Sequence, residues 1–98
     1  MKLSDYQKFI DEVWVSDGKD YNLQLAIAGL GLGGEAGEST EYIKKFLRGS
    51  HKELHADDLM DELGDVLYYI GKIGNLIGVT MDEMLDHNVN KLTARYKR

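Results

Sequence analysis

The stretch that decides the fold is ADDLMDELGDVLYYIGKIGNLIG, residues 56–78. Apolar residues recur in it at three- and four-residue spacing, and the chain contains no proline, so the pattern is that of one long amphipathic helix. Gly78 stands where a helix usually stops and turns. We therefore predict a helix from Ala56 or Asp57 to Ile77, the most apolar element of the chain.

Helical spacing of apolar residues also occurs earlier in the chain. Ser4 followed by Gln7 indicates a capping box, which predicts a first helix over residues 5–16. A second helix is predicted over residues 22–47, because Gly49 stands just beyond it in the position of a helix C-cap.

The last predicted helix begins at another capping box, formed by Thr80 and Glu83, and runs to Tyr96. Strand-like alternation is scarce, and no linker, repeat or low-complexity tract divides the chain. We therefore expect an all-α fold in which residues 1–98 form one domain, a four-helix bundle.

The two long predicted helices are rich in glycine, although each interior glycine costs roughly 0.5–1 kcal/mol relative to alanine. The glycines are Gly29, Gly31, Gly33, Gly34 and Gly37 in one helix, and Gly64, Gly71, Gly74 and Gly78 in the other. The later four fall on one narrow strip of a helical wheel. This indicates close packing against a helix of the same chain or of a second subunit, whereas the cluster before Glu35 indicates a kink.

Size and charge limit the kinds of partner. A chain of 98 residues buries little apolar surface alone, so we expect a homodimer or homotetramer in which two copies complete the site. The net charge of -5 disfavours duplex nucleic acid as a partner. There is no cysteine, no secretory pattern and no apolar run near the roughly 20 residues that span a bilayer, so we expect a cytoplasmic protein without a membrane partner.

Four acidic residues occupy unusual positions on the two long helices. Acids on soluble helices usually face water, but Glu35 and Glu62 each border an apolar stripe. Glu38 and Asp65 follow them by one turn and therefore share their faces. If the stripes pack together, the four carboxylates converge and repel unless cations neutralise them. All-oxygen ligands favour Mg²⁺, with Mn²⁺ as an alternative, and the open coordination positions favour a phosphorylated substrate.

Three segments of the chain carry a recognisable pattern. They are GEAGESTE at residues 34–41, followed by Lys44-Lys45 and Arg48; DELGDVLYY at 61–69; and NVNKL at 88–92, followed by Arg95-Tyr96. Paired ExxE and ExxD motifs on consecutive helices are fairly specific in combination. In this order the segments resemble the MazG-like nucleotide pyrophosphohydrolases of the all-α NTP pyrophosphatase superfamily, over nearly the whole chain.

The resemblance implies hydrolysis of a nucleoside or deoxynucleoside triphosphate between its α and β phosphates, which releases monophosphate and pyrophosphate. It implies that Glu35, Glu38, Glu62 and Asp65 bind Mg²⁺ and that the enzyme is a homodimer or homotetramer. Glu35 and Glu38 are the catalytic candidates, with Glu38 preferred as the acceptor of the proton of the attacking water. The chain departs from the family at Ser39-Thr40, where an aliphatic or alanine pair is usual, and this puts the local packing in doubt.

Basic residues are candidates for binding the substrate phosphates. Asn88, Lys91 and Arg95 lie on one face of the last predicted helix at three- and four-residue steps. The alternative is that Lys91 and Arg95 are solvated or paired with nearby acids. Lys45 is a secondary candidate, against the alternative that it forms an ordinary i, i+4 pair with Glu41.

Aromatic residues are candidates for stacking on the base, and from Trp14, Tyr42, Tyr69 and Tyr96 we select Trp14, against the alternative of core packing for each of them. His51, His55 and His87 lack the spacing of metal ligands, and we interpret them as surface residues.

Two other functions fit the sequence. A phosphoribosyl-ATP pyrophosphohydrolase cleaves the same type of bond within the same superfamily. A non-catalytic helical oligomer or binding module would hold a structural ion with these acids or leave them in solvent. The base, the sugar and the number of metal ions are left open by the sequence.

Overall fold

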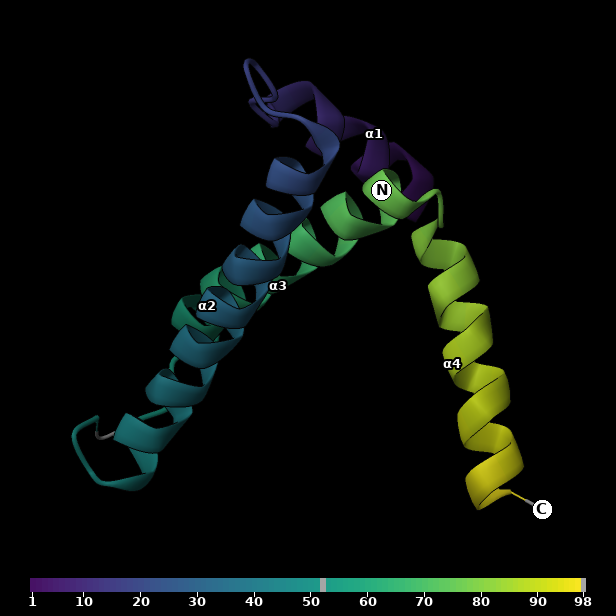
Figure 1. Cartoon of the computed structure of the whole chain (residues 1–98). Coiled ribbons are helices and arrows are strands. Elements are labelled where there is room, and N and C mark those ends of the chain that lie inside the picture. The colour runs from purple at the N-terminus through teal and green to yellow at the C-terminus, as the bar shows by residue number, and fades with distance from the viewer. Residues whose placement is uncertain (52, 98) are drawn as a thin grey trace.

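The computed structural model describes residues 1–51 and 53–97. Four helices follow one another: α1 (Leu3–Val13), α2 (Tyr21–Leu47), α3 (Ala56–Ile77) and α4 (Met81–Tyr96). The described residues contain no strand (Figure 1). The predicted all-α fold of four helices is confirmed, and α2, α3 and α4 begin and end within one residue of the predicted positions. None of the helices in these ranges is long and apolar enough to cross a membrane.

The prediction for α1 was wrong at both ends. α1 begins at Leu3, and no side chain caps its start, because the Gln7 side-chain oxygen, which a capping box would use, accepts from the Met81 N–H of α4 instead. α1 ends at Val13 rather than Ser16, because the backbone of Trp14 is already extended.

Between α1 and α2 the chain turns at Gly18, whose φ is +71°. The Asp20 carboxylate then accepts a hydrogen bond from the Leu23 N–H and caps α2. α2 continues unbroken from Tyr21 to Leu47 through its glycine cluster. Within that cluster, Gly31 leaves room for Tyr69 of α3, because a Cβ at this position would lie 2.4 Å from the Tyr69 ring. The cluster therefore includes a close helix contact and no helix break.

The turn from α3 to α4 follows the predicted pattern. Gly78 ends α3 in the left-handed conformation, with φ +77°. The Thr80 hydroxyl accepts from the Glu83 N–H, and the Glu83 carboxylate accepts from the Thr80 N–H, so the predicted capping box is confirmed. Gly71 and Gly74 lie against side chains of α1 and α4, which is the same-chain packing considered for this strip.

The helices form an open arrangement (Figure 1). α2 and α3 pack along each other, α1 lies across the apex, and α4 runs away on the other side; α4 contacts α1 and α3 but not α2 among the described residues. The radius of gyration is 16.0 Å, whereas a compact chain of this length has about 13 Å. Large apolar side chains stay exposed, among them Leu30 at 79% and Val89 at 60%. One chain therefore covers only part of its apolar surface.

Candidate metal centre

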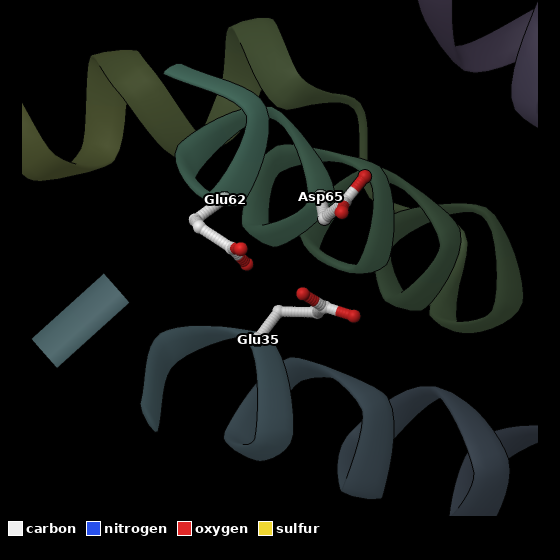
Figure 2. Close-up of side chains that lie close together, drawn as sticks. All are labelled: Glu35, Glu62 and Asp65. Carbon is white, nitrogen blue, oxygen red and sulfur yellow. The ribbon is translucent and has the colours of Figure 1, made fainter. Parts of the chain in front are cut away.

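The packing of α2 against α3 brings three carboxylates together. Glu35 comes from α2, and Glu62 and Asp65 come from successive turns of α3. One carboxylate oxygen of each lies within 4.8 Å of the others, and Figure 2 shows Glu35 and Glu62 directed into the space between the helices, with Asp65 beside them on α3. The structure therefore brings together three of the four acids predicted to be metal ligands.

Local sequence explains this convergence. Glu35 and Glu62 lie at the edges of the apolar faces by which α2 and α3 pack, so both side chains are half-buried, whereas Asp65 is exposed. The packing is close because Gly31, one turn before Glu35, admits the ring of Tyr69, one turn beyond Asp65. The glycine and the aromatic residue thus fix the separation of the helices beside the acids.

Two of the carboxylate oxygens have no partner. Oε2 of Glu35 and Oε2 of Glu62 are buried and accept no hydrogen bond from the described part of the chain. A buried polar atom without a partner is costly, and an ionised one more so. Each oxygen belongs to a carboxylate of the converging group, where a cation would supply the missing interaction.

The proton affinities of the glutamates reflect this crowding. Hydrogen bonding to Glu38 in the protonated state, burial, and the negative charges of Glu38, Glu35 and Asp65 raise the pKa of Glu62 to about 7. Burial, followed by the charges of Glu38 and Asp65, raises the pKa of Glu35 above its usual value. The four acids therefore form one electrostatically coupled group, and a divalent cation would favour their ionised forms.

Glu38 lies beside this cluster. Its side chain is exposed, and it lines a groove of about 370 Å³ together with Glu62, Lys45 and other residues. Glu41 pairs with Arg48 at 3.4 Å and with Lys44 at 4.0 Å, so the i, i+4 pair of Glu41 with Lys45 is not formed in the described structure. Lys45 is thus placed next to the acids, where a phosphate group would meet its charge.

The remaining candidates lie away from the acids of their own chain. Asn88, Lys91 and Arg95 are exposed on α4, which diverges from the α2–α3 pair (Figure 1). The guanidinium carbon of Arg95 lies 5.7 Å from the centre of the Tyr96 ring. A single chain therefore does not bring these three residues to the carboxylates.

Trp14, the residue just after α1, contacts residues of α2 and α3. Its indole N–H donates to Gln24 Oε1 at 3.0 Å, and its ring lies 6.2 Å from that of Tyr68. The ammonium group of Lys72 lies 4.9 Å from the centre of the indole. These contacts give Trp14 a packing role, and its contact with a substrate base stays a prediction.

Some residues near the acids were not selected from the sequence. Tyr6 of α1 lies close enough to Asp65 that, after burial, the charge of Asp65 raises the pKa of the phenol. His51, interpreted above as a surface residue, is half-buried in the groove and stacks on Tyr42 with ring centres 5.2 Å apart. The Tyr42 hydroxyl also accepts from the His55 N–H. The course of a loop has no periodicity from which these contacts could be derived.

Comparison with known proteins agrees with this geometry. The family model described as MazG nucleotide pyrophosphohydrolase domain matches residues 27–98, a range that includes all four acids. The chain is 39% identical over 77 residues to the Gene 37 protein of Mycobacterium phage L5. The aligned residues make up 76% of this chain and 68% of that protein. No solved structure matches the chain.

Proposed function

The chain belongs to the MazG nucleotide pyrophosphohydrolase family, and from this premise we propose that it hydrolyses nucleoside or deoxynucleoside triphosphates in a Mg²⁺-dependent reaction. Cleavage falls between the α and β phosphates and gives a monophosphate and pyrophosphate. One observation carries the proposal: Glu35, Glu62 and Asp65 converge within 4.8 Å, and two of their oxygens are buried without a partner. Such a group of atoms suits a hard divalent cation.

The residues present fit Mg²⁺, with Mn²⁺ as an alternative, because every donor is a carboxylate oxygen. Glu35, Glu62 and Asp65 would hold the cation, and Glu38 would join them from the adjoining groove. Bound there, the cation supplies positive charge to the phosphate oxygens and makes an attacking water more acidic.

The side chains of the groove carry out the remaining work. Glu38 accepts the proton of the attacking water, since it lines the groove beside the converging acids. Lys45, on the same groove, balances the charge of the triphosphate. Glu35 and Glu62 would hold the cation in a fixed place, because both lie where α2 and α3 pack together.

The α4 residues act on the site of a second copy, in a homodimer or homotetramer. Support comes from the exposed apolar surface, which includes Leu85 and Val89 on α4 and Leu63 and Leu67 on α3. Covering this surface with another chain would carry the basic face of α4 towards a neighbouring acidic site. We assign Asn88, Lys91 and Arg95, which share one face of α4, to the substrate phosphates in that arrangement.

A substrate panel tests the proposal. The wild-type protein and Glu62→Gln are incubated with canonical and modified NTPs and dNTPs and with phosphoribosyl-ATP, in Mg²⁺ or Mn²⁺, and the products are separated. We expect monophosphate and pyrophosphate from the wild type and almost none from the variant. The matched control is Glu12→Gln, an exposed glutamate of α1, which retains activity. Diphosphate plus phosphate as products, cleavage of phosphoribosyl-ATP alone, or intact nucleotides throughout would each contradict the proposal.

A further inference from the structure

The joint between α3 and α4 is held by a residue of α1. Gln7 is only 7% exposed, and its Oε1 accepts a hydrogen bond from the Met81 N–H at 2.6 Å. Its Nε2 donates to Asn75 Oδ1 at 2.9 Å and to the Val79 carbonyl at 3.3 Å. The Gln7 amide therefore bonds the last turn of α3, the connecting turn and the first residue of α4.

This contact differs in kind from the capping box of α4. Thr80 and Glu83 satisfy each other's N–H groups from within the same turn, so they help α4 to form in any direction. The Met81 N–H, another of the free donors at a helix start, is satisfied by a side chain of a different helix. Because the Met81 N–H bonds a side chain of α1, this hydrogen bond fixes the position of the first turn of α4 relative to α1.

The surroundings hold Gln7 in place. Asn75 Nδ2 donates to the backbone carbonyl of Gln7 and to Asp11 Oδ1, each at 2.9 Å. These two hydrogen bonds connect α1 to α3. Asp11 also accepts from the buried Lys72 ammonium at 3.0 Å. Shape adds to this rigidity, because Gly74 lies so close to the joint that a Cβ would stand 2.6 Å from the Val79 carbonyl oxygen.

Within the described residues, the buried part of α4 lies at its start. Among the described residues α4 contacts only α1 and α3, and beyond its first turns its residues are exposed. Figure 1 shows the helix leaving the joint and extending away from the α2–α3 pair. Its direction is therefore set where it starts. A small change of angle at the first turn moves the last turn of α4 much farther than it moves the first.

We propose that Gln7 is a positioning residue, which fixes the direction in which α4 presents Lys91 and Arg95 to the triphosphate in the site of a second copy. The inference rests on the proposed function for its effect on the substrate. Because the acids lie on α2 and α3, which Gln7 does not bond near the site, loss of its hydrogen bonds weakens substrate binding and spares the chemical step. We expect Gln7→Met to raise KM roughly 5- to 10-fold and to change kcat less than about twofold.

Kinetics of three variants test this. Gln7→Met keeps the length of the side chain and removes all its hydrogen bonds. Gln7→Glu keeps an acceptor for the Met81 N–H but sets a carboxylate oxygen against Asn75 Oδ1 and the Val79 carbonyl oxygen, so its KM should also rise. Lys8→Met is the matched control, because Lys8 is the exposed neighbour on α1 and should keep the wild-type KM. Equal KM values for all three, or a fall in kcat without a rise in KM for Gln7→Met, would overturn the inference.

A second measurement does not depend on catalysis. The chain has no cysteine, so Lys44→Cys on α2 and Asn90→Cys on α4 accept one spin label each. With labelled chains diluted in unlabelled protein, double electron–electron resonance gives the distance between the label on α2 and the label on α4 of the same chain. We expect a narrow distribution in the wild type and in Lys8→Met, and a broader or shifted one in Gln7→Met.

The two measurements separate the two proposals. If the wild type cleaves nucleotides but Gln7→Met changes neither the distance distribution nor KM, the inference is overturned and the proposed function stands. If the wild type cleaves no nucleotide, the proposed function falls, and an unchanged distance distribution in Gln7→Met would overturn the role of Gln7 as well. Circular dichroism verifies that each variant is folded.

Discussion

Two regions of the molecule bury polar side chains and treat them in opposite ways. At the joint of α1, α3 and α4, the amide groups of Gln7 and Asn75 bond backbone and side-chain partners. Between α2 and α3, buried oxygens of Glu35 and Glu62 have no partner in the described structure. A fully bonded polar group stabilises a fold, whereas buried, unbonded carboxylates cost stability until a ligand arrives. This difference is what we expect if the joint is structural and the acidic cluster is the proposed binding site.

The largest expected effect comes from the acidic cluster. Glu62→Gln should lower kcat/KM by at least about 100-fold, because it removes a charged ligand where the triphosphate charge must be neutralised. The same variant should melt at a higher temperature than the wild type without metal, because one repelling charge is gone. Pyrophosphate release and thermal melting in EDTA give the two values. Activity within twofold of that of Glu12→Gln would break the contrast between the two regions.

The next largest effect is expected from two glycines of α3, one at the joint and one beside the acidic cluster. Gly74→Ala places a Cβ against the Val79 carbonyl oxygen, a backbone atom of the joint, and should destabilise the protein by about 1–3 kcal/mol. Gly64→Ala, beside Asp65, meets no atom within 4 Å and should stabilise the helix by up to about 1 kcal/mol. Urea unfolding of both variants gives the difference. Equal free energies of unfolding would mean that the joint is not tightly packed.

The smallest expected effect is a dependence of stability on pH. The pKa of Glu62 rises from 4.5 to about 7 on folding, so between these values the folded chain holds a proton that the unfolded chain has lost. Without metal, the stability contributed by this group is therefore full below pH 4.5 and is lost as the pH rises through 7. Melting temperatures in EDTA should fall over this range, less so in Glu62→Gln. Saturating Mg²⁺ should raise the melting temperature more at pH 8 than at pH 5, and the reverse order would contradict the assignment.

The sequence predicts the acidic region well, because helical periodicity relates residues on one face. Glu35 and Glu38, like Glu62 and Asp65, are three apart, so two long helices with apolar stripes are enough to bring three of these acids together and to place Glu38 beside them. The end of α3 at Ile77 follows from Gly78, whose left-handed conformation is a local property.

The joint could not be predicted in the same way. Gln7 has the spacing of a local cap for Ser4, but its amide bonds residues 68 to 74 positions away, which no local pattern indicates. The divergence of α4 likewise depends on this joint, since the amphipathic pattern of α4 does not say which helix it packs against. For the same reason, the sequence predicts the helix that carries Lys91 and Arg95 but does not predict how far these residues lie from the acids.

Binding of a divalent cation tests the central claim most directly. Mn²⁺ titration, followed by calorimetry and by the resonance signal of the free ion, is carried out on the wild type, Glu62→Gln and Gln7→Met. We predict saturable binding to the wild type and to Gln7→Met with similar affinity, and binding weaker by about tenfold or more to Glu62→Gln. Equal affinity of the wild type and Glu62→Gln, or no saturable binding to the wild type, would contradict the account.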